Sequence, residues 1–355
     1  MIVLKDGYAN ISPLEWKVLA NIPSSLRIVD IAKKTGLPYS STRTIVMRLR
    51  SRARISFIPS FKELGLIPIM ALYDGFMDNS LFPTYTVRVI NLYGNGAYTM
   101  VNALVPYMYR RHYLELIDED PLAIVEGHEF YPWHPDNNII LYNRKTKNIS
   151  YTFSKIKDVF NKMLEKNEDS SSKDPAIRGR ISELDVAIIS EKIHYAFAKV
   201  SDIAKKLKVN VSKQLLSYHF RSKVSKIWRY NSVVIFRYPK TYPYKIFLIE
   251  GEEASHFAKS IYRLPGFDGV IIDRRRDLAV IVGQPDNAII NKMYEFAHKE
   301  ELKVKINTLT ALHDGVAHFK LSLYRHFEKN SWKSPRMENL RRETSIVKSV
   351  LLPLP

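Results

Sequence analysis

The most restrictive feature of the sequence is an internal repeat. Four segments of the first half recur in the second half in the same order, which indicates a tandem duplication of one module. At 355 residues, the chain is also too long for a single compact core and suits several smaller domains. The matched segments are residues 11–15 with 181–185, 29–34 with 200–206, 122–127 with 278–283, and 135–137 with 285–287.

Positive charge is concentrated at the start of each copy. The net charge is +18; residues 1–66 carry 11 basic and 4 acidic side chains, and residues 181–240 carry 12 and 4. These two segments therefore hold 15 of the 18 excess charges. A surface adapted only for solubility would spread its charge. Two separate basic blocks are instead typical of a protein that binds a polyanion such as nucleic acid.

The first basic block opens with a helix-start pattern. Ser12 is followed three residues later by Glu15, the arrangement in which a serine caps a helix and the acid completes a capping box. Leu14, Val18 and Leu19 are then expected to share one helical face. The sequence thus predicts a short helix that begins just after Ser12.

Two further helices are predicted, over residues 28–35, ended by Gly36, and over residues 38–50. In the third helix, hydroxyl side chains and an arginine lie opposite a buried stripe. That pattern suits a helix that enters the major groove and contacts phosphates or base edges. A solvated charged face is the alternative interpretation, and the charge clustering weighs against it. The stripe is Thr42, Val46 and Leu49, the opposite face is Ser40, Ser41, Arg43, Thr44 and Met47, and the arginines leading to a wing are Arg50, Arg52 and Arg54.

This region resembles the winged helix-turn-helix of the leucine-responsive (Lrp/AsnC) regulator family, archaeal type. The resemblance rests on residues 36–37, Thr42, Val46, 48–49, Ile55 and 61–66 (FKELGL). In that family a similar final stretch leads from the wing into a small βαββαβ domain for effector binding and dimerisation. The resemblance therefore implies the same two-part architecture here.

The second copy is similar to the broader winged-helix regulators over residues 211–220 (VSKQLLSYHF). Further on, the patterns predict strand, helix, strand, strand, helix and strand, which is the split ferredoxin-like order. In the first copy the order is less regular, because residues 139–153 favour strand over helix. The predicted segments of the second copy are residues 244–250, 251–264, 267–273, 278–282, 287–302 and 303–309.

The predicted fold class is α+β, with two winged helix-turn-helix domains, each followed by a ferredoxin-like (βαββαβ) domain, in tandem duplication. The two ferredoxin-like sheets can pack against each other as those of two chains would, and the linker is long enough to permit this packing without forcing it. The predicted divisions are residues 1–66 (first winged helix), 67–164 (divergent ferredoxin-like domain), 165–180 (exposed linker), 181–240 (second winged helix), 241–327 (second ferredoxin-like domain) and 328–355 (basic C-terminal tail).

The function predicted from these features is DNA-binding transcriptional regulation, with no enzymatic activity and no cofactor. Double-stranded DNA is the expected partner, and a small-molecule effector and a homodimer are left open. Basic side chains would neutralise phosphates, and the polar ones would read bases. The predicted DNA-contacting residues are Lys33, Lys34, Tyr39, Ser40, Ser41, Arg43, Thr44, Arg48, Arg50, Arg52, Arg54, Lys205, Lys206, Ser212, Lys213, Gln214, Ser217, Tyr218, Arg221, Lys223 and Lys226.

Two alternatives use the same parts. A non-specific chromatin or nucleoid protein would bind DNA without reading bases. Siroheme decarboxylases, which are enzymes, also resemble tandem modules of this family, but residues 229–231 do not reproduce their histidine- and arginine-rich motifs.

Several other classes are excluded. The absence of cysteine removes disulfides, thiolate metal sites and cysteine nucleophiles, and no glycine-rich phosphate loop is present. His128, Glu129 and His134 lie close in sequence, but intervening prolines prevent a helix that would bring them together, so no metal site is predicted. Apolar runs fall short of the roughly 20 residues of a membrane helix, and no signal peptide is visible. We therefore expect no membrane partner and a cytoplasmic, nucleoid-associated protein.

Overall fold

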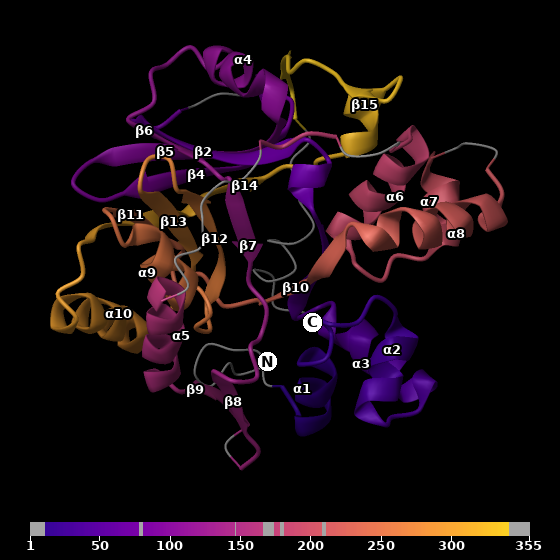
Figure 1. The fold of residues 1–355 in the computed structure, drawn as a ribbon, viewed down its shortest axis with the longest axis horizontal. Helices are drawn as coiled ribbons and strands as arrows, with labels where there is room; N and C mark the ends of the chain where they lie inside the picture. The colour runs from indigo at the N-terminus through magenta and orange to yellow at the C-terminus, as the bar shows by residue number, and fades with distance from the viewer. Residues whose placement is uncertain are drawn as a thin grey trace.

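The computed structural model describes residues 11–77, 81–145, 147–165, 174–177, 181–207 and 211–340, and the side chains of Asn148, Ser201, Lys205, Lys206, Leu207, His313 and Asp314 lie outside the described part. It is a mixed α+β structure in which one large antiparallel sheet takes strands from both halves of the chain (Figure 1). The predicted α+β class is therefore confirmed. Among the residues described, none of the helices has the length and apolarity needed to cross a bilayer.

Three short helices open each half, and the first begins where the sequence predicts. The Ser12 hydroxyl accepts a hydrogen bond from the Glu15 amide (3.2 Å), and the Glu15 carboxylate accepts one from the Ser12 amide (2.8 Å). Leu14 was expected to be buried but is 54% exposed, because the inward face is set by buried Glu15 together with Val18 and Leu19. The helices are α1 (Pro13–Leu19), α2 (Ile28–Thr35) and α3 (Tyr39–Leu49) in the first half, and α6 (Glu183–His194), α7 (Val200–Leu207) and α8 (Lys213–Ser222) in the second.

Each helical group is followed by a strand, and these two strands, β1 (Ala53–Pro59) and β10 (Trp228–Ile235), pair with each other in antiparallel orientation. Hydrogen bonds also join the loop after the first helix of each group to the strand of the other half. The Asn231 side chain in β10 donates to the Ile22 carbonyl after α1 (3.2 Å), and the Ala196 amide after α6 donates to the Ile55 carbonyl in β1 (3.0 Å). Each helical group is thus attached to the strand of the other half.

The large sheet has nine strands, four main ones from each half and one added at the edge. Counted along the chain, both sets of four have the order fourth, first, third, second, as expected of a duplicated module. The strands, in sheet order, are β6 (Ala123–Glu126), β2 (Leu66–Asp74), β5 (Ala97–Pro106), β4 (Thr86–Tyr93), β14 (Lys305–His318), β11 (Lys245–Glu250), β13 (Leu278–Gly283), β12 (Phe267–Asp273) and β7 (Glu129–Pro132).

The sheet closes on itself. Strands β6 and β7 stand at opposite ends of the strand order, yet only Gly127 and His128 separate them in the chain. The Glu126 amide donates to the Asp273 carboxylate of β12 (3.2 Å), so β6 at one end of the order also contacts β12 near the other end. A closed sheet encloses an interior. Here it is filled by apolar side chains from both halves, including Met70, Ile90, Met100, Ile246, Ile271 and Val280.

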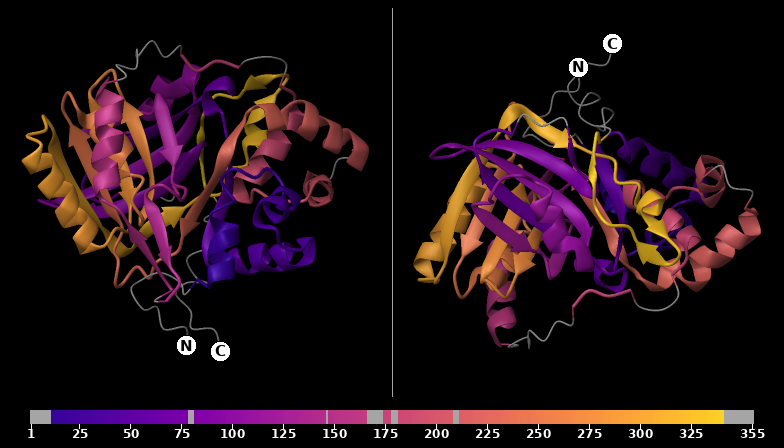
Figure 2. Two further views of the ribbon diagram at one scale, coloured as in Figure 1. Left: turned by 60° about the horizontal axis from the view of Figure 1, so that its bottom comes forward. Right: turned by 90° about the horizontal axis from the view of Figure 1, so that it is seen from above.

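The end of the first half covers strands of the second half. Helix α5 (Ser154–Glu165) buries Ile156 and Phe160 in the same cluster as Phe257 of α9 (Ala254–Ile261). Figure 2 shows α5 beside the strands of the second half. Strand β7 extends this exchange by pairing with β12.

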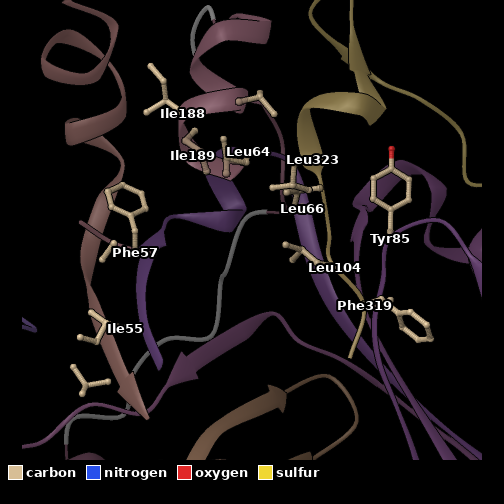
Figure 3. Close-up of a cluster of buried hydrophobic side chains, with 14 of the residues drawn as sticks. Ile55, Phe57, Leu64, Leu66, Tyr85, Leu104, Ile188, Ile189, Phe319 and Leu323 are labelled. Carbon is tan, nitrogen blue, oxygen red and sulfur yellow. The ribbon is translucent and has the colours of Figure 1, made fainter. Parts of the chain in front are cut away.

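The end of the second half in turn covers strands of the first half. Figure 3 shows Phe319 and Leu323 packed near Leu104 and Tyr85. Further on, the Trp332 indole N–H donates to the Leu64 carbonyl (2.7 Å). The two halves therefore cover each other with their own C-terminal extensions, and Trp332 of the predicted basic tail (residues 328–355) belongs to the core.

Several connections differ from the predicted pattern. The second half has both predicted helices, α9 and α10 (Asn287–Lys299), but β14 continues past residue 309 because its far end pairs with β4. In the first half, the described part of the β2–β4 connection holds β3 (Phe82–Pro83) and no helix, while α4 (Arg110–Glu115) joins β5 to β6.

Residues 139–153 form strands as predicted, and α5 follows them without having been predicted. The Ala176 amide, in the predicted linker, donates to the Lys62 carbonyl (3.1 Å). The remaining short elements are β8 (Ile140–Asn143), β9 (Asn148–Tyr151), β15 (Phe327–Glu328), β16 (Ser331–Trp332), β17 (Met337–Glu338), η2 (Phe61–Glu63), η3 (Tyr107–Tyr109), η4 (Val224–Lys226) and η5 (Leu323–His326).

Candidate nucleic-acid interface

Helix α3 has one buried and one exposed face, divided as the sequence predicts. Thr42, Val46 and Leu49 are fully buried. The opposite face is exposed, and within the described part of the chain Arg43 has neither an ion pair nor a hydrogen bond. The exposed face consists of Tyr39, Ser40, Ser41, Arg43, Thr44 and Met47. An unengaged guanidinium among small hydroxyl side chains can donate to an incoming acceptor at no cost in lost internal bonds.

The hydroxyl of Thr44 is already used inside the helix, since it donates to the Ser40 carbonyl (3.0 Å). Its methyl group is therefore the part left to make new contacts. The Ser40 and Ser41 side chains are exposed beside it. This end of α3 thus presents small donors and one long cation, which fits a narrow space lined with acceptors.

Two arginines that the sequence predicts to contact DNA also connect α1 to the end of α3. Nη1 of Arg48 lies 3.5 Å from the buried Glu15 carboxylate, and Nη1 of Arg52 lies 3.2 Å from it. Burial alone would raise the pKa of Glu15, but hydrogen bonds from Ser12 and the charges of Arg52 and Arg48 outweigh burial and lower the pKa. Arg48 keeps a side chain more than half exposed, whereas Arg52 is largely covered.

The other two arginines of this stretch contact the second half of the chain. The Arg50 guanidinium lies over the Tyr195 ring, 4.6 Å from its centroid. Nη2 of Arg54 lies 3.5 Å from the carboxylate of Asp268 in β12. Arg50, Arg52 and Arg54 therefore all have partners within the protein, although Arg50 is exposed.

Helix α8 presents a different exposed face. The Ser212 hydroxyl accepts a hydrogen bond from the Leu215 amide (3.1 Å) and so caps the helix. Lys213 and Gln214 are exposed beside it, and Tyr218 is 60% exposed one turn later. Arg221 extends this exposed stripe, Ser217 is half-buried, and Leu216 and Phe220 form the buried side.

In the second helical group, a buried acid also connects the first helix to the third, as Glu15 does in the first group. Asp185 occupies the same capping-box position as Glu15 and is equally buried. Nδ1 of His219 lies 2.7 Å from its carboxylate, and Nζ of Lys223 lies 3.4 Å from it. In both copies, therefore, a buried acid contacts one side chain of the third helix and one basic side chain just after it, and Lys223 corresponds to Arg52.

The remaining predicted residues divide into three cases. Lys33 and Lys226 are exposed. Lys34 is exposed but donates to Ser24, at 2.7 Å from its hydroxyl. Lys205 and Lys206 lie in α7, and their side chains are outside the described residues.

The two helical groups lie next to each other on one side of the molecule, away from the closed sheet (Figures 1 and 2). Pairing of β1 with β10 joins them, and the Tyr195–Arg50 contact adds a second link. Their relative position is therefore fixed by the fold and does not depend on a flexible linker.

The acids that form ion pairs with these arginines were not identified from the sequence. The sequence predicts Glu15 as a capping residue, and Asp185 occupies the matching position of the repeat. Burial of such an acid opposite a basic helix was the available signal. Asp268 gave no local signal. Within the described residues, no group of three or more histidine, aspartate or glutamate side chains could hold a metal ion; His128 lies against Asp273, Glu129 is bonded to Lys259 and Arg274, and His134 lies against Tyr230.

Comparison of the sequence with protein-family models finds no match, and comparison with curated proteins finds none either.

Proposed function

We propose that this chain is a transcriptional regulator that binds double-stranded DNA with α3 and α8 in the major groove. In this proposal residues 1–66 and 181–240 are winged helix-turn-helix domains, and residues 67–164 and 241–327 are ferredoxin-like domains. The paired strands β1 and β10 would then take the place of two separate wings. The concentration of 15 of 18 excess charges in the two helical segments supports this assignment.

The observation that carries the proposal is the exposed face of α3. Arg43 stands near the helix start among Ser40, Ser41 and Thr44, all exposed, and it has no partner among the described residues. A guanidinium at this position of a groove-binding helix reaches the O6 and N7 acceptors of guanine. Arg50, Arg52 and Arg54 contrast with it, because the fold already uses them.

Phosphate contacts fall to the exposed basic side chains around the two helices. Lys33, Lys213, Arg221 and Lys226 are exposed on the two helical groups. Cations at these positions would neutralise backbone phosphates and release counterions without reading sequence. Base readout would then rest on Arg43 in one group and Gln214 in the other.

The test is selection of a binding site from random duplexes, followed by competition with unselected DNA. Arg43→Ala is expected to cost about 1–3 kcal/mol on the selected site and much less on unselected DNA. Arg111→Ala is the matched control, because Arg111 is an exposed arginine on α4, remote from the helical groups (Figure 1).

Three results separate the alternatives. Failure to enrich any sequence, with tight binding to all duplexes, would favour a non-specific chromatin protein. Equal loss on both DNAs in Arg43→Ala would assign Arg43 to phosphate. Absence of DNA binding at low salt would refute the proposal.

A further inference from the structure

A row of polar side chains crosses the interior of the closed sheet at one level. Asn102 of β5 stands directly opposite Arg88 of β4, and Arg88 stands directly opposite His318 of β14. Directly opposed residues of adjacent antiparallel strands project to the same side. Met70, which stands opposite Asn102 on β2, and Ile90, two residues after Arg88, belong to the interior cluster, so the polar row lies on the inner face.

The charge of this row is only partly balanced. Asp268 is 8% exposed, accepts a hydrogen bond from the Tyr244 hydroxyl, and lies 3.5 Å from Nη1 of Arg88 and 3.5 Å from Nη2 of Arg54. Burial, with the charges of Arg88 and Arg54, lowers the pKa of His318 to about 3, so His318 is neutral at pH 7. Two guanidinium groups thus share one carboxylate, which leaves one positive charge in excess.

Three polar atoms of the row have no partner. Asn102 is 8% exposed, and neither its Nδ2 nor its Oδ1 has a hydrogen-bond partner among the described residues. Nη1 of Arg88 is buried and has no hydrogen bond either, since its approach to Asp268 lacks hydrogen-bond geometry. Each buried polar group left without a partner costs on the order of 1–3 kcal/mol. Such groups in a folded protein point to an ion or a water that pairs with them.

We propose that a compact monovalent anion, of the size of chloride, nitrate or formate, binds between Nδ2 of Asn102 and Nη1 of Arg88. The excess positive charge favours an anion over a cation and over a neutral molecule of the same size. The interior side chains Met70 and Ile90 flank the row, so the proposed ligand is a small one. Asn102 and Arg88 both come from the first half, whereas His318 and Asp268, which lie beside Arg88, come from the second.

The test measures thermal unfolding of the full chain without DNA, so the result is independent of the proposed function. Ionic strength is held constant with sodium gluconate, whose anion is too large for the row, while sodium chloride, nitrate or formate replaces it stepwise. We expect a saturable rise of a few degrees in melting temperature with each small anion, and none with gluconate alone.

Two variants and a control make the assignment. Asn102→Leu removes the unpartnered amide from an apolar face, so it is expected to fold and to lose the saturable response. Arg88→Met is expected to lose it as well, whereas Arg111→Met, at an exposed arginine of α4, is expected to keep it. Line broadening of the chloride-35 NMR signal gives a second readout that is independent of stability. A response that survives in Asn102→Leu would mean an adventitious ion only and would overturn the proposal. The absence of any response in the unmodified chain would overturn it as well.

Discussion

Nη1 of Arg52 lies 3.2 Å from Oε1 of Glu15, which stands 37 residues earlier in the chain. The contact locks the end of α3 to the start of α1, and Asp185 with His219 repeats it in the second half at 2.7 Å. Because the acid is buried and also belongs to a capping box, one carboxylate supports both the helix start and the packing of the helices.

The ion pairs of Glu15 predict that removing its charge lowers the stability of the protein. Glu15→Gln keeps the size of the side chain but removes the charge, and it is expected to lower the free energy of unfolding by about 1–3 kcal/mol at pH 7. Asp158→Asn is the control, because Asp158 pairs with Lys155 on the surface, where both side chains are half exposed, and an exposed pair contributes under about 1 kcal/mol. Urea denaturation of both variants is the measurement.

The effect of Glu15→Gln depends on pH with a definite sign. The folded-state pKa of Glu15 lies below its ordinary value of 4.5. Its ionisation therefore stabilises the fold fully above pH 4.5, and that contribution is lost as the pH falls through the folded-state pKa. The gap between variant and wild type should close in acid. A gap of constant size down to pH 3 would show that the charge of Glu15 does not stabilise the fold.

The burial of Lys192 predicts that the free energy of unfolding depends on pH in the alkaline range. It is 4% exposed, donates to the carbonyls of Ala196 (2.9 Å) and Ala198 (3.3 Å), and burial lowers its pKa from 10.5 to about 8. Below pH 8 the folded state must keep a charged amine buried, which costs up to about 3 kcal/mol; the cost disappears as the pH rises toward 10.5.

Lys192→Met removes this cost and loses the two hydrogen bonds. The free energy of unfolding of the variant relative to wild type is therefore expected to fall steadily as the pH rises from about 8 toward 10.5. Lys199→Met, at an exposed lysine nearby, should show a constant difference over the same range. A flat difference for Lys192→Met would contradict the burial of its amine.

The salt dependence of DNA binding distinguishes surface cations from those engaged in the fold. Each phosphate contact adds about 0.9 to the slope of log affinity against log salt. Lys213→Ala with Lys226→Ala, two exposed positions, should lower the slope by about 1.8. Arg54→Met should leave it unchanged, because Asp268 already holds that guanidinium. A lower slope for Arg54→Met would show that DNA displaces Asp268.

Cleavage between the halves should not separate them. Strand β7 pairs with β12, α5 packs on α9, and β17 pairs with β3, so each half holds elements of the other. A protease site introduced between residues 166 and 173 should give two fragments that elute together in size-exclusion chromatography and separate only in denaturant. Elution as two separate folded species would contradict the exchange of elements.

Local features of the fold could be predicted because their causes lie within a few residues. The capping box at Ser12 and the end of α2 at Gly36, which has φ 67°, are of this kind. The alternation of the second-half strands likewise predicted their existence. Their partners could not be predicted, since period-two patterning identifies a strand but not the strand beside it.

The candidate site shows the same limit. Exposure of Arg43 follows from the stripe of Thr42 and Val46 on its own helix, so the sequence placed it correctly on the outer face. Arg54 has the same charge and lies close by in sequence, yet its carboxylate partner is Asp268 in the other half. The pattern of positive charge therefore identified a basic region. Which of its cations are free to bind a partner depends on contacts between residues far apart in the sequence.

The exchange of C-terminal extensions has a consequence for synthesis of the chain on the ribosome. The hydroxyl of Tyr85 donates to the carbonyl of Lys333, 248 residues later, and the Leu64 carbonyl accepts from Trp332. At roughly 5–20 residues per second, the strands of the first half wait about 10–50 s for these covering residues. Throughout that interval, the outer face around Leu66 and Leu104 is an apolar surface without its final cover. Such a chain is expected to need protection from aggregation until these covering residues have been made.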